Sequence, residues 1–254
     1  IGGGPTGVEM AGSIAEIAYK TLNKEFNNFN SEDPNVYLIE ANDKLLPMFS
    51  KKLSDKAEQY LNDFGVKVLK NEKVTNVNHS NVETDKRTIK SRNIIWAAGN
   101  TASSLIEKLN TITDDSGRAI VDPDCSLKDD PDVFVIGDAS NHKDTSNTPL
   151  PGIAPVAMQQ GKYVGKIIKN KILKMDRKPF KFSDKGMMAT VGKYKAIGKI
   201  GNIEVSGFIA WVFWSVIHIV YLIGYRSKLL VIIEWIFSYL FNKKGTRLIY
   251  REEI

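Results

Sequence analysis

The chain begins with the glycine-rich segment Ile1-Gly2-Gly3-Gly4-Pro5-Thr6-Gly7, which limits its fold more than any other segment. Gly2, Gly4 and Gly7 have the G-x-G-x-x-G spacing of dinucleotide-binding folds. In those folds the glycines permit a tight strand-to-helix turn, backbone approach to a pyrophosphate, and close packing of the helix on the sheet. The glycines alone also fit a flexible turn. Only Ile1 stands where an apolar strand normally precedes the turn, so we expect a preceding segment in a longer protein.

The residues after the turn favour dinucleotide binding. Residues 9–18 are typical of a helix with small residues on one side, and Val36–Glu40 is typical of a second strand that ends in an acid. A carboxylate there accepts hydrogen bonds from the adenosine ribose hydroxyls, which favours NAD(H) over NADP(H). The acid lies further from the turn than the usual ~20 residues, because a helix end and loop are expected in the polar stretch Asn23–Pro34. Glu40 also fits an ordinary exposed carboxylate.

Composition indicates a globular chain and narrows its partners. The 254 residues are 43% hydrophobic and 25% charged, enough for one large domain or two modest ones. The net charge of +6 suits a nucleic acid or an anionic membrane. Because the lysines are scattered and no basic-aromatic motif is present, we predict no nucleic-acid partner. One cysteine excludes a disulfide within the chain, and the three histidines lack metal-ligand spacing, so no metal site is predicted.

The first domain is expected to occupy residues 1–100. A helix that ends near Gly65 is followed by the strand Val66–Leu69 and by short alternating segments over residues 73–84, which suit an antiparallel meander. The apolar run Ile94–Ala98 is expected to close the domain as a buried strand that enters a turn at Gly99. This order is typical of a doubly wound nucleotide-binding domain.

A second signal lies in residues 101–175, where an apolar strand over residues 133–136 leads into Gly137-Asp138. The carboxylate of Asp138 could accept a hydrogen bond from a ribityl hydroxyl, while Gly137 lets the backbone approach a cofactor. The helix expected from Ala154 to Leu173 would present its N-terminal N–H groups to the electron-rich edge of a flavin. A plain turn after a strand is the alternative interpretation.

The C-terminal part contains two almost wholly apolar runs, Gly207–Gly224 and Leu229–Phe241. A membrane span needs about 20 apolar residues, so the first run is marginal and the second too short. Polar residues recur along the first run and aromatic and basic residues border both, which favours helices that lie in the membrane interface. A buried helical hairpin, a dimer interface and a single-pass span are the alternatives.

At this point the chain resembles the type II, non-electrogenic NADH dehydrogenases of the two-dinucleotide-fold flavoprotein superfamily. The matching stretches run in order through nearly the whole chain, and they are residues 2–9, 38–41, 95–99, 133–138, 154–161, 184–192 and 206–211, followed by the apolar tail. The resemblance implies an α/β fold: a Rossmann-like NADH domain (1–100), the C-terminal portion of an FAD-binding domain (101–175), and amphipathic membrane-anchoring helices (176–254). The first segment of the FAD domain would precede this chain.

The resemblance implies FAD-dependent transfer of electrons from NADH to a membrane quinone without proton pumping. It places Glu9 and Gln159 in catalytic roles, Glu9 near the nicotinamide or in a proton relay and Gln159 near the quinone. The cofactor-binding residues it implies are Gly2, Gly4, Pro5, Thr6, Gly7, Glu9, Glu40, Ala98, Gly99, Gly137, Asp138, Ala154, Ala157 and Lys185. The quinone-site motif often begins Ala-Gln, whereas here Pro155 follows Ala154 and supplies no side-chain amide.

The resemblance also implies a peripheral, monotopic protein on the cytoplasmic face of a bacterial inner or plasma membrane, and it allows a homodimer. Two other functions fit part of the sequence. A soluble flavin disulfide reductase would share the glycine turn and Gly137-Asp138, but it needs a soluble C-terminal dimerisation unit with a catalytic histidine, where this tail has His218 in an apolar run. A non-enzymatic, membrane-associated nucleotide-binding fragment is the other alternative. A sulfide:quinone oxidoreductase needs cysteines near the flavin, which Cys125 alone supports poorly.

Overall fold

The computed structural model describes residues 1–21, 35–222 and 224–241, so the loop expected over residues 23–34 lies outside the described residues. The chain divides into two compact units. The first combines Ile1–Ala97 with Gly186–Ile254, and the second is Ala98–Lys185. Segments from the two ends of the sequence therefore form one unit, and the middle of the sequence forms the other.

The N-terminal part of the first unit has the predicted strand–helix order. Helix α1 (Pro5–Glu16) continues into the π-helical turn η1 (Ile17–Thr21), and β1 (Val36–Ile39) pairs in parallel with β2 (Val66–Leu69). Helix α3 (Lys51–Asp63) connects the two strands. It begins at Ser50, whose hydroxyl accepts the Leu53 N–H at 3.3 Å, and this cap satisfies a donor that the helix leaves free. The predicted α/β order with parallel strands is confirmed for this part.

The predicted meander is confirmed, whereas the predicted closing strand is wrong. Strands β3 (Val74–Val77), β4 (Asn81–Thr84) and β5 (Thr88–Lys90) pair antiparallel in this order. Residues 94–98 form no strand, and Trp96 is 60% exposed. Among the described residues, this segment's hydrogen bonds go to Ile1, which donates to the Ile95 carbonyl and accepts from the Ala97 N–H, each at 2.8 Å. One residue is too short a partner for a ladder, so Ile95, Trp96 and Ala98 stay exposed while Ile94 and Ala97 are half-buried.

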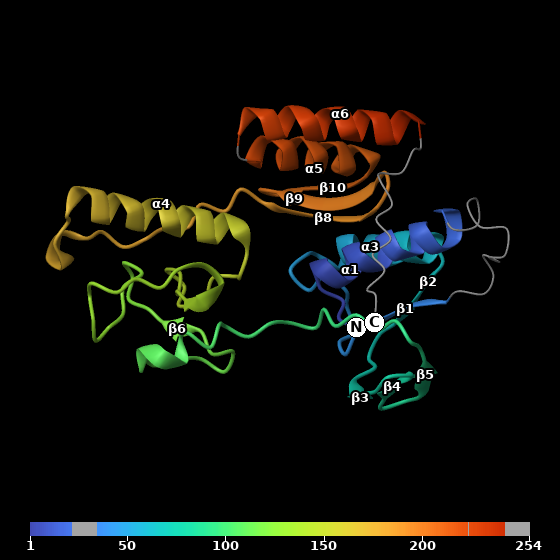
Figure 1. Ribbon diagram of the computed structural model, residues 1–254, viewed down its shortest axis with the longest axis horizontal. Coiled ribbons are helices and arrows are strands. Elements are labelled where there is room, and N and C mark those ends of the chain that lie inside the picture. Colours follow the sequence, from blue (N-terminus) through green and yellow to red (C-terminus); the bar gives the residue numbers. More distant parts are fainter. Residues whose placement is uncertain (22–34, 223, 242–254) are drawn as a thin grey trace, which may run out of the picture. The chain divides into compact units, whose positions relative to one another are not determined.

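The C-terminal part of the first unit is an antiparallel sheet followed by two helices. Strands β8 (Met187–Gly192), β9 (Lys195–Ile200) and β10 (Ile203–Gly207) have the order β10-β9-β8. The two apolar runs form α5 (Phe208–Tyr221) and α6 (Tyr225–Phe241). Within this unit α1 and α3 contact one face of the sheet, while α5 covers the other and α6 lies beyond it (Figure 1). None of the described helices combines the length and apolarity needed to cross a bilayer.

One hydrophobic core joins the two sequence-distant parts of this unit. It contains Val8 of α1, Leu38 of β1, Leu61 of α3, and Val191 and Ile197 of the C-terminal sheet, all at most 2% exposed. The amphipathic faces of α1 and α3 therefore pack against the parallel strands and against the C-terminal sheet together. The C-terminal sheet is thus part of the core of the first unit.

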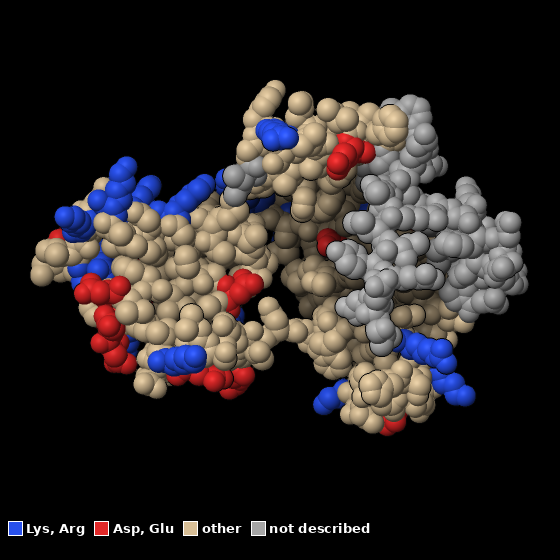
Figure 2. Space-filling model, viewed as in Figure 1, with Lys and Arg blue, Asp and Glu red and all other residues tan. Residues whose placement is uncertain are grey.

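The second unit contains little regular structure besides one long helix. Its elements are η2 (Glu107–Leu109), β6 (Ala119–Ile120), η3 (Gly137–Ala139), β7 (Ser140–Asn141), α4 (Ala154–Asn170) and η4 (Lys174–Asp176), with β6 and β7 parallel. Helix α4 ends earlier than predicted because Lys171 takes the left-handed conformation that stops helices. Lysine and arginine side chains gather over this unit's α4 region (Figure 2).

The strand predicted over residues 133–136 is only an extended segment with one isolated bridge, between Phe134 and Ser126. Val135 donates to the Cys125 carbonyl at 3.0 Å and is buried. Cys125 has a φ of 65°, which a regular strand does not tolerate. The partner segment is therefore kinked where a ladder would have to continue.

Candidate functional site

The glycine turn in the first unit has the close contacts that its spacing predicts. A Cβ on Gly7 would lie 1.8 Å from the Gly2 carbonyl oxygen, so only glycine lets the helix start so near the turn. Gly2 itself has a φ of 104° and donates to Ile39 at 2.8 Å, which ties the turn to the end of β1. A Cβ on Gly4 would meet no atom within 4 Å. The space over Gly4 is thus open to a ligand, whereas the space at Gly7 is filled by backbone.

The start of α1 is suited to an anion. Pro5 occupies the first turn and Thr6 is exposed beside it, and no side chain caps the N-terminus. The first turn carries no acidic residue. Free N–H groups and the helix dipole therefore present a positive end to a ligand.

Glu40 lies beside this turn. One of its carboxylate oxygens accepts the Gly3 N–H at 2.6 Å, and the other accepts the backbone and side-chain N–H groups of Asn42 at 2.9 and 2.6 Å. The hydrogen bond from the Gly3 N–H is strong because its acceptor is a carboxylate. The structure thus brings the predicted acid within contact of the predicted glycines, with its carboxylate fixed from both sides.

The side chain of Glu9, in α1, contacts Thr190, which lies 181 residues later in the sequence. Its Oε1 accepts the backbone N–H of Thr190 in β8 at 3.3 Å. Burial raises the pKa of the Glu9 carboxyl, while hydrogen bonds from Thr190 and the charge of His218 act in the opposite direction. The resulting pKa lies above the usual range of glutamate, so the carboxyl keeps its proton to higher pH.

The Gly137-Asp138 turn in the second unit is held by the start of α4. Gly137 has a φ of 64° and donates its N–H to Gln160 Oε1 at 2.7 Å. A Cβ on Gly137 would lie 3.1 Å from the Ala157 methyl carbon, so the small size of both residues permits the contact. Gln160 is fully buried, and its Nε2 has no hydrogen-bond partner in the part of the chain that the structure describes. The buried Gln160 amide therefore helps to fix the turn, together with the Ser140 hydroxyl, which donates to the Gly137 carbonyl at 2.9 Å.

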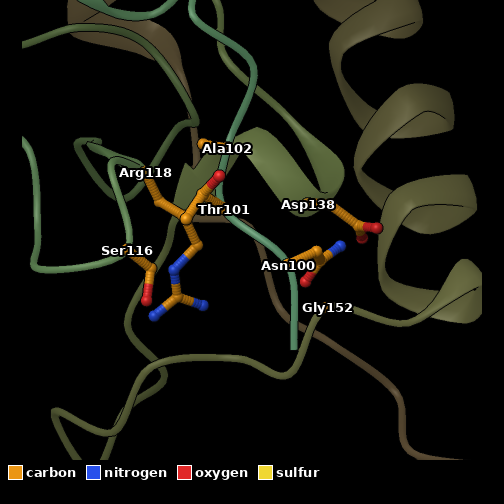
Figure 3. A pocket seen from close by; sticks show the side chains of 7 residues that line it. All are labelled: Asn100, Thr101, Ala102, Ser116, Arg118, Asp138 and Gly152. Atoms are coloured by element: carbon orange, nitrogen blue, oxygen red, sulfur yellow. The ribbon is translucent and has the colours of Figure 1, made fainter. Parts of the chain in front are cut away.

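Asp138 is exposed and lines a cavity of about 250 Å³ within this unit. Figure 3 shows Asp138 near the Asn100 side chain at one side of the cavity, with Arg118 and Ser116 at the other. Arg118 is held by Asp114 through Nε and Nη2, each 2.7 Å from the same carboxylate oxygen. Small-molecule pockets commonly measure about 300–1,000 Å³, so this cavity can accept part of a dinucleotide.

The remaining predicted residues have simpler surroundings. Gln159 is bound at both ends of its amide by the backbone of Ser183, at 3.0 Å each. Ala154 is exposed at the start of α4, where Pro155 fits the first turn. Ala98, Gly99 and Lys185 are exposed at the two ends of the second unit. The structure thus groups the turn residues with Glu40 and Glu9, and groups Gly137, Asp138 and Ala157 separately.

Sequence reasoning missed Gln160 and Gly12. Gln160 was one of two adjacent glutamines, and only the fold distinguishes the buried one from its neighbour. A Cβ on Gly12 would lie 1.6 Å from the Val191 carbonyl oxygen, so this glycine permits α1 to rest on β8. The only signal for Gly12 in the sequence was its position five residues after Gly7. The described residues contain no cluster of side chains that could hold a metal ion.

Two family models match the chain. Residues 1–161 match the pyridine nucleotide-disulphide oxidoreductase model, and residues 185–244 match the NDH2 C-terminal domain. The chain is 38% identical over 257 residues to the type II NADH:quinone oxidoreductase Ndh of Mycobacterium tuberculosis, covering 96% of this chain and 54% of that protein. It is 30% identical to the internal alternative NAD(P)H-ubiquinone oxidoreductase A1 of Arabidopsis thaliana, covering 98% of this chain and 52% of that one.

A comparison with solved structures points to the same group of proteins for the fold. The structure of NDH2 from Plasmodium falciparum in complex with NADH superposes with a TM-score of 0.84 at 19% identity, covering 96% of this chain and 65% of that chain. The chain spans about half the length of the curated relatives it matches.

Proposed function

The chain belongs to the pyridine nucleotide-disulphide oxidoreductase family as a homologue of the type II NADH:quinone oxidoreductases, and from this membership we propose that it serves FAD-dependent electron transfer from NADH to a membrane quinone without proton pumping. The observation that carries the proposal is the pairing of an open space over Gly4 with the fixed carboxylate of Glu40. The pyrophosphate of a dinucleotide requires such an open space beside the turn, and its ribose requires such a hydrogen-bond acceptor.

In the proposed NADH site the backbone of the turn binds the pyrophosphate. Gly2, Gly4 and Gly7 shape the turn, and the N–H groups at Thr6 and Gly7 face the phosphates without a competing cap. Glu40 accepts the ribose hydroxyls with the carboxylate lone pairs that Gly3 and Asn42 leave free. A 2′-phosphate at this point would meet a negative charge, so the site favours NADH over NADPH.

In the proposed FAD site, Asp138 accepts a ribityl hydroxyl, while Gly137 and Ala157 keep the surface low enough for a cofactor to approach. The cavity beside Asp138 fits part of that cofactor. Ala154, Ala98, Gly99 and Lys185 stay proposals on the resemblance. When bound, FAD supplies the two-electron redox chemistry that no side chain of this chain can supply.

Glu9 is proposed to hold a proton for quinone reduction, which consumes two protons. Burial raises the pKa of its carboxyl, so the group exchanges a proton nearer to neutral pH than an exposed glutamate does. Gln159 is proposed to position the quinone-site helix through Ser183, because both ends of its amide already bind that backbone.

A peripheral membrane location is proposed from the surface of α5 and α6. Exposed apolar side chains follow one another at helical spacing along both helices, and they are Phe208, Ile209, Val212, Phe213, Val216, Val220, Leu229, Leu230, Ile233, Ile236 and Phe237. So large an apolar surface suits helices that lie in the interface with their apolar sides in lipid. The modules 1–100, 101–175 and 176–254, a cytoplasmic face of a bacterial membrane, and a homodimer remain proposals of the same kind.

The activity is tested with purified protein supplied with FAD, NADH and a water-soluble quinone. We expect NADH-dependent bleaching of flavin absorbance and quinone-dependent oxidation of NADH. Flavin absorbance without bleaching by NADH would refute the dehydrogenase function. Binding without any redox turnover would favour the non-enzymatic nucleotide-binding alternative.

The nucleotide site is tested by Glu40→Gln, with the neighbouring exposed Asp43→Asn as control. Charge-assisted hydrogen bonds contribute about 1.5–3 kcal/mol, so we expect NADH affinity to fall at least about tenfold in Glu40→Gln and little in Asp43→Asn. Affinity for NADPH should fall less or rise, since a repulsive charge is removed. Equal losses for both nucleotides would indicate a purely structural role through Gly3.

The anchor is tested by Val216→Ser combined with Val220→Ser, two exposed positions on α5. Binding to lipid vesicles should weaken without loss of folding. The control replaces Leu105 and Ile112, two exposed residues of the second unit, with serine. Equal vesicle binding by wild type and the α5 variant would show that α5 does not contact lipid.

A further inference from the structure

Helix α4 has one buried and one basic face. Its buried side chains include Gln160, Val164 and Ile167. Lys162, Lys166 and Lys169 have the same four-and-three spacing, shifted by two residues, so they lie on the opposite side of the helix. All three lysines are exposed.

The lysine density continues beyond the helix. Residues 161–185 contain nine lysines and arginines and two aspartates. The net charge of this segment, nine minus two or +7, is larger than the net charge of +6 of the whole chain. Lys171, Lys178 and Lys181 are exposed as well. The basic side chains over α4 form a visible cluster in Figure 2. The sequence of this segment therefore concentrates basic residues, and helical spacing places Lys162, Lys166 and Lys169 on one side of α4.

Two other cations of this segment act as anchors for a turn. Lys174 contacts Asp122 at 3.0 Å and Asp124 at 2.9 Å, and Arg177 contacts Asp124 at 3.2 Å. Both ends of η4 are thereby fixed to the body of the unit. Met175 lies between these anchors and is 86% exposed.

Further apolar side chains of the same segment of the sequence are exposed. Ile168 and Leu173 are each exposed by more than 60%. The aromatic residues of the segment, Tyr163, Phe180 and Phe182, are buried or half-buried. Single-stranded nucleic acids need exposed aromatic platforms, whereas lysines around aliphatic tips fit anionic headgroups above an acyl layer.

We propose that Lys162, Lys166, Lys169 and Lys171, together with the exposed apolar side chains Leu173 and Met175 that follow the helix, form a second membrane-contact surface that binds anionic lipid headgroups. We call this set the α4 basic face. This proposal depends on the proposed function in one respect, which is that the protein acts at a membrane. The apolar helices α5 and α6 would supply hydrophobic anchoring, and the α4 basic face would supply dependence on lipid charge.

The test compares vesicle binding of the full chain on phosphatidylcholine alone and on phosphatidylcholine containing phosphatidylglycerol. The variant carries Lys162→Gln, Lys166→Gln and Lys169→Gln. Each surface lysine contributes on the order of fivefold in binding to an anionic surface, so the triple variant should lose roughly 100-fold on the anionic vesicles. Its binding to phosphatidylcholine should stay unchanged.

A matched control changes the net charge equally at exposed positions outside the surface, with Lys86→Gln, Lys128→Gln and Lys143→Gln. We expect this control to bind anionic vesicles within a few-fold of wild type. Replacing Met175 with serine should weaken binding to anionic vesicles but leave its salt dependence intact, because no charge is removed.

Three outcomes would overturn the proposal. If both lysine variants bind anionic vesicles equally, only net charge matters and the α4 basic face has no role. If the α4 variant instead loses binding to a short RNA and not to vesicles, the surface serves a nucleic acid. If wild type shows no preference for anionic vesicles, the surface does not bind lipid headgroups. NADH oxidation with a soluble quinone needs no vesicle, so failure of the proposed enzyme function is measured separately.

Discussion

Gly12→Ala is the substitution that tests most directly how α1 meets the C-terminal sheet. The new Cβ would lie 1.6 Å from the Val191 carbonyl oxygen. Since Cβ atoms keep at least about 3.0 Å from other heavy atoms, α1 and β8 must separate by at least about 1.4 Å. Backbone cannot rotate out of the way as a side chain can.

The cost follows from the groups on that side of the helix. Val8, Ala11 and Ala15 are buried in the shared core, and a gap of this size forfeits half or more of their packing, about 2 kcal/mol. Weakening of the hydrogen bond from Thr190 to Glu9 adds about 1 kcal/mol. The helix propensity of alanine returns about 1 kcal/mol. We therefore expect Gly12→Ala to lower the free energy of unfolding of this unit by about 2 kcal/mol.

The assay uses the chain's own tryptophans. All four, Trp96, Trp211, Trp214 and Trp235, belong to the first unit, so their fluorescence reports its unfolding. A loss of about 2 kcal/mol should lower its melting temperature by roughly 4–8 °C.

Gly165→Ala is the matched control, because Gly165 is exposed inside α4 and a Cβ there meets nothing within 4 Å. Far-ultraviolet circular dichroism should show stabilisation of about 0.5–1 kcal/mol. If Gly12→Ala also stabilised the protein, the packing of α1 on β8 would be refuted.

Three further predictions concern buried polar groups. Burial alone would raise the pKa of Asp124, but its hydrogen-bonded partners lower it to about 2, so it stabilises the fold above its ordinary value of 3.8 and this contribution is lost as the pH falls through about 2. Asp124→Asn should cost about 3–5 kcal/mol in urea unfolding at neutral pH, since the buried Arg177 guanidinium loses its buried carboxylate partner and is left with the exposed Asp132 carboxylate at 3.7 Å, and should flatten the acid limb. Burial raises the pKa of Glu9, so wild type should lose stability relative to Glu9→Gln as the pH rises above about 4.5, and parallel unfolding curves for the two would contradict this. Gln160→Leu strands the Gly137 N–H and should cost about 1–3 kcal/mol in thermal unfolding while weakening FAD retention; unchanged FAD retention would show that the turn does not need this amide.

Features set by local sequence were predictable. The alternating segments of the meander, the start of α3 at Ser50 and the helical form of both apolar runs each follow from periodicity or from a cap within a few residues. The contact between the glycine turn and Glu40 was also within reach, because the end of β1 must lie beside the turn in this fold.

Features set by distant partners were not predictable. The apolar run Ile94–Ala98 has the composition of a buried strand, but burial depends on neighbouring strands, and here Ile1 is its pairing partner. The roles of Gly12 and Gln160 depend on one backbone atom each, at Val191 and Gly137. No spacing rule identifies such contacts. The α4 basic face had the same difficulty, since its lysines look scattered until the buried side of the helix is known.

Helix α1 and the sheet that it contacts connect the proposed dinucleotide site at the turn with the proposed lipid-binding surface of α5. Glu9 and Gly12 lie three residues apart on one side of α1, and both meet β8, through Thr190 and Val191. The opposite face of that sheet is covered by α5, whose outer side chains are apolar and exposed. A dinucleotide at the turn and a lipid surface at α5 would therefore each stabilise the same folded unit by mass action. Because a single three-stranded sheet separates the two helices, displacing α5 must strain the packing that positions Glu9.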